Sequence, residues 1–369
     1  MSFPSLTIGN LTIALPIIQG GMGIGISLSG LASAVAAVGG VGVISAAGVG
    51  RDEPDYCTNF VEANSRALKK QIQKARELTK GILGVNVMVA LSNFAEVVKT
   101  SVKEKIDIIF SGAGLPLDLP KYIQDLEDKI APKLVPIVSS ARAAAIICKK
   151  WASRYDRLPD ALVVEGPMAG GHLGFKPEEI HDENFRLERL IPEVVEAVRP
   201  FEQASGKSIP VIAAGGIYTG ADIRKFLDLG AKGVQLGTRF VATHECDAAI
   251  EFKQAYVKAR KEDIEIVKSP VGMPGRAIHN VFLDRVDKGE KKPAACPYHC
   301  LRSCNQKASA YCISVALGNA KRGQTDNGLI FCGANAWRVK EIVSVQELVH
   351  ELSDEYERSA PGADAAPKA

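Results

Sequence analysis

The chain has 369 residues, of which 46% are hydrophobic and 24% are charged, so it can bury a sizeable core. These fractions exclude a disordered, fibrous or coiled-coil protein. The 45 Lys and Arg residues nearly balance the 42 Asp and Glu residues, and the net charge is only +3. Because so small a charge creates no strong electrostatic field, we expect no nucleic-acid partner and no membrane partner.

No charged side chain occurs between residues 2 and 50, a stretch long enough to suggest a membrane span. Many glycines interrupt the stretch from Gly20 onward, and Pro4 and Pro16 precede them. A signal peptide would need a basic start and an unbroken apolar segment, and neither is present. We therefore expect two buried strands and a helix of small residues here, in a soluble cytoplasmic protein.

Short apolar segments rich in Val and Ile recur along the chain and end in glycine or small polar residues, as buried parallel strands do. The predicted strands are 16–19, 42–45, 84–89, 106–111, 134–138, 161–165, 209–213 and 233–236. Helical periodicity between them predicts helices over 29–38, 64–80, 94–105, 141–153, 191–201 and 221–229. Ser29 and Thr219 are the predicted caps of the first and last of these helices.

Strands that alternate with helices predict an α/β protein, either a (β/α)8 TIM barrel or a doubly wound sheet. The doubly wound sheet requires the fingerprint G-x-G-x-x-G in its first turn. Two glycine pairs begin that fingerprint, but Ile26 and Leu28 stand where its last glycine must be. The TIM barrel is therefore the predicted fold.

The sequence pattern changes after residue 244, where we expect the strands to stop. We predict a barrel over 1–244, a mostly helical appendage over the barrel mouth in 245–350, and a C-terminal tail with a disordered end in 351–369. Within the appendage, the loop 269–276 is rich in Pro and Gly. Arg276 at its end either meets an anionic group at the mouth or braces the appendage.

Reacting groups in such barrels lie at the C-terminal ends of the strands. The seventh strand is followed by Gly215 and Gly216, and the eighth by Gly237 and Thr238. Glycines at these two ends allow backbone N–H groups to converge on an anion, so the pattern predicts a phosphate site.

Two ionisable residues follow the sixth strand. His172 comes after two glycines, and an imidazole on such a loop can transfer protons at neutral pH. Glu165 ends the strand itself and is expected to hydrogen-bond either the barrel backbone or a cofactor. His172 is therefore the candidate acid or base.

Five motifs combine into a specific signature across about residues 13–243: PIIQGGMG (16–23), GVNVM (84–88), VVEGPMAGGHLG (163–174), IPVIAAGGI (209–217) and GVQLGTRF (233–240). In these motifs the chain resembles the FMN-dependent barrels that include nitronate monooxygenase (2-nitropropane dioxygenase) and the flavin-containing enoyl-ACP reductase II. The resemblance implies an FMN-dependent oxidoreductase in which His172 is the active-site histidine.

Carried over by position, the resemblance also implies the residues that hold FMN. Gln19, Gly21 and Met22 would lie against the flavin ring and Asn86 would hydrogen-bond it. Gly171 would border the site. The phosphate end would be held by Gly216, Gln235, Gly237 and Thr238, and we add Glu165, Gly215 and Leu236 to the predicted cofactor-binding residues.

Four cysteines, Cys296, Cys300, Cys304 and Cys312, have the spacing C-x3-C-x3-C-x7-C. Without a secretory signal, such a cluster indicates metal or redox chemistry more than a disulfide framework. The spacing matches no standard motif, so a [4Fe–4S] cluster, zinc and no metal all stay open. The resemblance to flavin oxidoreductases with a similar cysteine-rich tail favours the iron–sulfur cluster.

The leading hypothesis is nitronate oxidation, with His172 as base and FMN as electron acceptor. The alternative reaction is reduction of an enoyl thioester with NAD(P)H as hydride donor. A non-catalytic flavin or electron-carrier subunit is a further hypothesis. A flavin-free isomerase or aldolase would need a lysine or paired carboxylates at the strand ends, where only Glu165 occurs. A homo-oligomer and an electron-transfer partner stay open.

Overall fold

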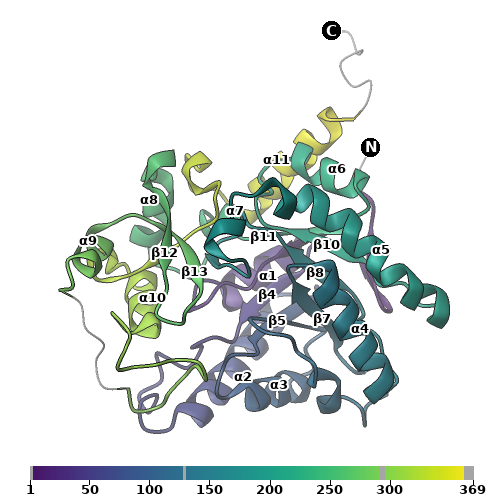
Figure 1. Ribbon diagram of the computed structural model, residues 1–369, viewed down its shortest axis with the longest axis horizontal. Coiled ribbons are helices and arrows are strands. Elements are labelled where there is room, and N and C mark those ends of the chain that lie inside the picture. Colours follow the sequence, from purple (N-terminus) through teal and green to yellow (C-terminus); the bar gives the residue numbers. More distant parts are fainter. Residues whose placement is uncertain (1–2, 128–129, 291–295, 361–369) are drawn as a thin grey trace.

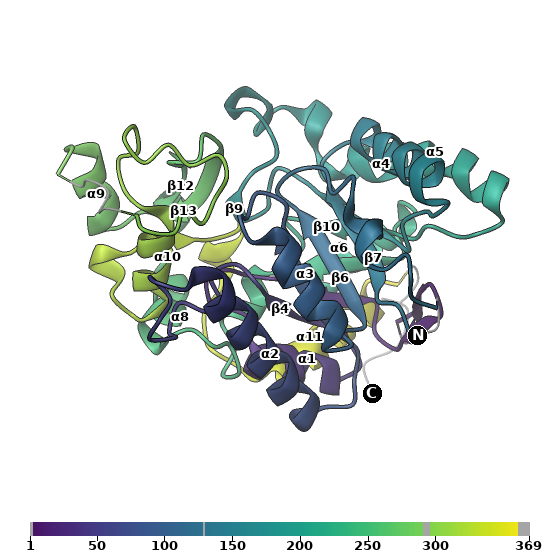
Figure 2. The ribbon, with the colours of Figure 1, turned by 90° about the horizontal axis from the view of Figure 1, so that it is seen from below.

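The computed structural model describes residues 3–127, 130–290 and 296–360, and its main feature is a barrel of eight parallel strands (Figures 1 and 2). The sheet order is β3-β11-β10-β8-β7-β6-β5-β4, and pairing of Ile18 with Val41 closes β3 on β4. The strands are β3 (Ile17–Gln19), β4 (Gly42–Ser45), β5 (Leu83–Met88), β6 (Ile108–Gly112), β7 (Lys133–Val138), β8 (Leu162–Glu165), β10 (Val211–Ala214) and β11 (Gly233–Leu236). The predicted TIM barrel is confirmed, and each predicted strand overlaps one of these eight.

Six helices surround the barrel where the sequence predicts them. They are α1 (Ser29–Ala37), α2 (Phe60–Leu78), α3 (Phe94–Lys103), α4 (Ala141–Tyr155), α5 (Leu187–Ser205) and α6 (Gly220–Asp228). The predicted cap of α6 is confirmed, because the Thr219 hydroxyl accepts from the Asp222 N–H in a capping box. After β11 the chain forms only the short helix α7 (Thr238–Val241) before it leaves the barrel.

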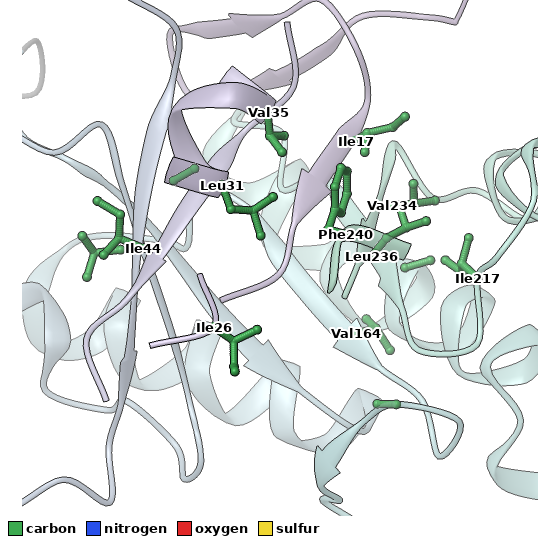
Figure 3. Close-up of a cluster of buried hydrophobic side chains, with 14 of the residues drawn as sticks. Ile17, Ile26, Leu31, Val35, Ile44, Val164, Ile217, Val234, Leu236 and Phe240 are labelled. Carbon is green, nitrogen blue, oxygen red and sulfur yellow. The ribbon is translucent and has the colours of Figure 1, made fainter. Parts of the chain in front are cut away.

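The alternation of side chains along the strands separates an outer core from an inner core. Ile17, Ile44, Val164 and Val234 point outward and pack in the layer beneath the helices (Figure 3). The inner core fills the barrel, with members that include Ile18, Val43, Phe110, Val163 and Ile212. The inward positions one layer higher therefore face the C-terminal mouth of the barrel.

A hairpin of β1 (Leu6–Ile8) and β2 (Leu11–Ile13), which was not predicted, contributes to the inner core. Leu6, Ile8 and Ile13 are buried with the inner strand residues. The repeat of Leu-Thr-Ile around Gly9 and Asn10 was an available signal, because a two-residue turn with a glycine joins paired strands.

The appendage contains helices α8 (Ile250–Lys258), α9 (Val281–Asp287) and α10 (Ile313–Lys321), which gather on one side of the barrel in both ribbon views. It also contains a small antiparallel sheet of β12 (Ile264–Lys268), β13 (Pro274–Ile278) and β14 (Ile330–Phe331), to which the barrel loop adds β9 (Gly171–His172). The expectation that strands stop after residue 244 is therefore wrong. These strands are short and depend on partners far along the chain, so local sequence carries little signal for them.

The last helix, α11 (Val345–Arg358), packs against α6 and also contacts α1 (Figure 1). It thus lies in the ring of helices around the barrel, although it follows the appendage in the sequence. The division of the chain at residues 244 and 350 stays a prediction.

Among the described residues, no helix combines the length and the apolar character that crossing a membrane requires.

The N-terminus of α1 is held by a side chain of the appendage and not by Ser29, which lies inside the helix. The Asp247 carboxylate accepts hydrogen bonds from the N–H groups of Leu28 at 2.7 Å, Gly30 at 3.1 Å and Leu31 at 3.1 Å. The predicted cap is wrong because a partner more than two hundred residues away satisfies the first turn.

Replacing Asp247 by alanine is expected to lower the free energy of unfolding by about 2 kcal/mol, because three buried N–H donors lose a charged acceptor. Urea unfolding followed by tryptophan fluorescence measures the change. As a control, Asp182→Ala removes a cap whose carboxylate forms an exposed hydrogen bond, accepting from the Asn184 N–H at 2.8 Å, and we expect a loss below about 1 kcal/mol. Equal losses in the two variants would contradict the assigned role of Asp247.

Candidate functional site

A cavity of about 560 Å³ lies at the C-terminal ends of the barrel strands, where the appendage forms its opposite wall. This volume is in the usual range for cofactor and substrate sites. The predicted site residues that line it are Gly21, Met22, Asn86, Glu165, Gly171, His172, Gly215, Gly216, Gln235, Leu236, Gly237 and Thr238. The barrel mouth therefore brings together residues from the ends of five strands, β3, β5, β8, β10 and β11.

Gln19 is the predicted cofactor-binding residue that does not line the cavity. Its side chain is 0% exposed and fills the seam between β3 and β4, where its Oε1 accepts from the Val43 N–H at 2.9 Å and its amide donates to the Gly20 carbonyl. Ile18 points into the barrel, so the alternation of the strand turns Gln19 to the other face. The side chain of Gln19 therefore does not face the cavity, and a contact of this residue with a cofactor stays a prediction.

Three polar side chains occupy inward positions at the strand ends: Asn86 on β5, Glu165 on β8 and Gln235 on β11. None of them forms a side-chain hydrogen bond with the described part of the protein. All three residues are half-buried and line the cavity, so their polar groups are available to a polar ligand there.

Two loops at the ends of β10 and β11 present free backbone donors to the cavity. The N–H groups of Gly215, Gly216, Gly237 and Thr238 donate to no acceptor within the described ranges. Gly215 and Gly216 have φ values of +94° and +83°, which glycine adopts without strain. The amide of Asn335 donates to the Gly216 carbonyl at 2.7 Å and fixes this turn. Successive free N–H groups of this kind form an anion site.

Gly21 allows the loop after β3 to approach β5 closely. A Cβ at this position would overlap the Cβ of Asn86. The backbone of residues 20–23 therefore lies flat against one wall of the cavity, as the sequence pattern indicates.

His172 is positioned by the appendage. Its strand β9 pairs with β13, where His172 lies opposite Gly275, and its Nε2 shares a hydrogen bond of 2.6 Å with the Ser269 hydroxyl. The Phe331 ring packs edge-on against the imidazole at 4.9 Å between centroids. Burial lowers the pKa of His172 to about 4, so the imidazole is neutral at physiological pH and can accept a proton.

Glu165 lies deep in the cavity, and burial raises its pKa to about 7. Desolvation is the one cause of this pKa shift, and no neighbouring positive side chain contributes to it. The carboxyl group is therefore about half protonated near neutral pH and can act as a hydrogen-bond donor as well as an acceptor.

Arg276 does not reach the cavity. Its guanidinium is buried and donates to the carbonyls of Pro167, at 2.8 Å, and of Ala169. It therefore braces the loop that precedes His172 from the side of the appendage, and the alternative of an anionic partner at the mouth is not found.

Of the four cysteines, Cys300 lines the cavity. Burial, with the charges of Cys312, Cys296 and Cys304, raises the pKa of Cys300 to about 12, so the four thiols lie within electrostatic reach of one another. Within residues 3–127, 130–290 and 296–360, however, no three His, Cys, Asp or Glu side chains are gathered as metal ligands. The predicted metal site at these cysteines is thus not formed here.

Sequence reasoning missed the appendage residues that complete the site. Ser269 and Phe331 contact His172, while Tyr256 of α8 lines another wall. Ser269 begins the Pro/Gly-rich loop noted in the sequence, but no local signal pairs it with His172.

The family model described as nitronate monooxygenase matches residues 5–355. A probable nitronate monooxygenase of Bacillus subtilis is 28% identical, over 93% of this chain and 96% of that protein. A Mycobacterium tuberculosis (3aS,4S,5R,7aS)-5-hydroxy-7a-methyl-1-oxo-octahydro-1H-indene-4-carboxyl-CoA dehydrogenase is 26% identical, over 75% of this chain and 66% of that protein.

Two solved structures resemble the whole described chain. FabK from Thermotoga maritima superposes with a TM-score of 0.71 at 28% identity, and 94% of each chain is covered. Nitroalkane oxidase from Streptomyces ansochromogenes has a TM-score of 0.71 at 22% identity, over 94% of this chain and 97% of that one. The second likeness concerns the fold alone.

The raised pKa of Glu165 predicts a pH-dependent stability. Between its usual value of 4.5 and about 7, the folded protein keeps a proton that the unfolded chain has lost. Stability therefore falls as pH rises through this window, by about 1.4 kcal/mol per unit. From pH 5 to pH 8 the free energy of unfolding should fall by about 3 kcal/mol more in the wild type than in Glu165→Gln. Urea unfolding at both pH values measures this, and equal slopes would contradict it.

Proposed function

Because this chain belongs to the nitronate monooxygenase family, a family of oxidoreductases, we propose that it is an FMN-dependent oxidoreductase. The observation that carries the proposal is the set of free N–H groups at the ends of β10 and β11, beside unpaired polar side chains in one cavity. A ligand with a phosphate at one end and a polar ring system at the other suits both features.

The residues present fit FMN. The amides of Gly215, Gly216, Gly237 and Thr238 would hold the phosphate without any cationic side chain. Asn86 would hydrogen-bond the flavin ring, which the backbone at Gly20 and Gly21 can approach because these residues have no side chain. When bound, FMN supplies the transfer of electrons to and from the substrate.

His172 would manage the substrate proton. As base, its neutral imidazole would take the α-proton of a nitroalkane and so leave the nitronate that is oxidised, while Ser269 and Phe331 hold the ring in place. Burial keeps the pKa of His172 low, so the basic form is present from about pH 5 upward. Glu165 would hydrogen-bond the cofactor from the inner layer of the barrel.

A second candidate reaction is reduction of an enoyl thioester with NAD(P)H as hydride donor. The mycobacterial relative is named a carboxyl-CoA dehydrogenase, and a thioester is thus a substrate class worth testing on this chain. A non-catalytic flavin subunit would bind FMN without turnover. A cytoplasmic location stays a prediction.

We also propose that Cys296, Cys300, Cys304 and Cys312 hold a [4Fe–4S] cluster. Four free thiols that influence one another electrostatically support it, as does the position of Cys300 on the cavity wall. Anaerobically purified protein should contain about four iron and four sulfide per chain. Cys304→Ser should lower both, whereas Cys57→Ser, which changes an exposed cysteine elsewhere, should not. Zinc, or no metal, in the wild type would refute the cluster.

Two variants separate cofactor binding from proton transfer. His172→Gln should keep FMN and lose turnover by about 10²- to 10⁴-fold, because a general base is removed. Gly237→Val should bind FMN at least about tenfold more weakly, because the valine side chain would enter the phosphate site. The variant should still fold, because the atom nearest to a Cβ at this position is Met22 Sδ, at 3.5 Å.

The measurements are the absorption spectrum and steady-state rates with 2-nitropropane, which has an α-proton, with propyl-2-nitronate, which has none, and with crotonyl thioesters plus NAD(P)H. Thermal unfolding of both variants without FMN controls for misfolding. Purified protein that neither contains nor binds FMN would contradict the proposal. Protein that binds FMN but turns over none of these substrates would support the non-catalytic subunit.

A further inference from the structure

The appendage segment 333–338 packs over the two glycine turns at the ends of β10 and β11. The amide of Asn335 donates to the Gly216 carbonyl, in the first of these turns, at 2.7 Å. Gly333 lies so close to the second turn that a Cβ on this residue would overlap the Thr238 hydroxyl. The segment therefore touches both of the turns that present free N–H groups to the cavity.

Two arginine side chains lie over the ring of Tyr218, which is two residues from Gly216 and is 7% exposed. Arg338, at the end of the appendage segment, has its Cζ 4.2 Å from the centroid of this ring. Arg239, which directly follows Thr238, has its Cζ 4.5 Å from the same centroid. Contact with an aromatic face stabilises a guanidinium. Two guanidinium groups on one ring also gather positive charge beside both turns.

Of these two arginines, only Arg239 has an acidic partner among the described residues. Its Nη2 donates to the carboxylate of Glu351. Arg338 is half-buried, and its guanidinium forms neither a hydrogen bond nor an ion pair with any residue that the structure describes. The carboxylate of Asp222 is engaged elsewhere, because it accepts from the Tyr218 N–H at 3.0 Å and belongs to the capping box of α6. Arg338 therefore carries a positive charge that the described part of the protein does not balance.

We propose that Arg338 supplies, from outside the cavity, the positive charge that balances the phosphate of the bound cofactor. The inference rests on the proposed function, because this phosphate is that of FMN. Arg338 does not line the cavity, so it acts through its electric field, while the backbone N–H groups bind the phosphate oxygens. Within the described ranges no lysine or arginine lines the cavity. A phosphate there is partly removed from water, so a nearby charge stabilises it more strongly than the same charge would in water.

Titration with FMN and with riboflavin isolates this effect, because the two flavins differ only in the phosphate. Full-length protein freed of flavin is titrated with each, and the quenching of flavin fluorescence gives the dissociation constants. At about 0.1 M salt, where charges act over about 10 Å, Arg338→Gln should weaken FMN binding by about three- to tenfold and change riboflavin binding less than about twofold. At about 1 M salt, where charges act over about 3 Å, the variant should bind FMN within about twofold of the wild type.

Two further variants separate the charge of Arg338 from its packing. Arg338→Lys keeps a cation over the Tyr218 ring and should bind FMN within about twofold of the wild type. Lys340→Gln removes a charge two residues further along the chain, from an exposed side chain whose Nζ donates to the Trp337 carbonyl at 3.1 Å. Because water and salt screen an exposed charge, this variant should change both affinities less than about twofold. Thermal unfolding without flavin shows whether each variant is folded.

The same ratio of FMN to riboflavin affinity in Arg338→Gln as in the wild type would overturn the inference. An equal loss in Arg338→Lys, or a loss that persists at high salt, would also overturn it, because either would indicate packing and not charge. An equal loss in Lys340→Gln would show that the effect is not specific to Arg338. Wild-type protein that binds no flavin contradicts the proposed function and this inference together, whereas flavin binding that does not depend on Arg338 contradicts the inference alone.

Discussion

Free backbone N–H groups at the ends of two neighbouring barrel strands are the constraint on which the site depends. A buried donor without an acceptor is costly, and Gly215, Gly216, Gly237 and Thr238 present such donors to one cavity. Glycine at three of these positions leaves space where side chains would otherwise project. The barrel therefore maintains a place for an anion without placing a cation there.

The appendage positions the loop of the barrel that carries His172. β13 pairs with β9, Ser269 bonds His172, and Arg276 holds the loop between Glu165 and His172. His172 is largely buried among these contacts. The same desolvation moves the pKa of Glu165 up and that of His172 down, so the chemistry of both groups follows from the packing of a segment about one hundred residues away.

The main features of the fold were predictable because the signals are local. Eight Val/Ile-rich segments with glycine ends mark the strands, and their alternation with helical periods indicates the barrel. The hairpin at Leu6–Ile13 was missed because its three-residue strands are too short for a clear period. The Gln19 side chain was expected to face the cavity because a motif does not indicate which face of a strand a residue occupies. Ile18 points into the barrel, so the next residue, Gln19, points to the other face.

The sequence by itself determined the order of strands and helices and the glycine turns, since periodicity and turn chemistry act between near neighbours. It also singled out His172 among the six histidines by its place after a strand end. Only the tertiary structure decided that Asp247 holds α1, that Ser269 and Phe331 orient His172, and that no cationic side chain lines the described cavity. Those facts depend on contacts between distant segments and on burial. Neither property is encoded at any single position of the chain.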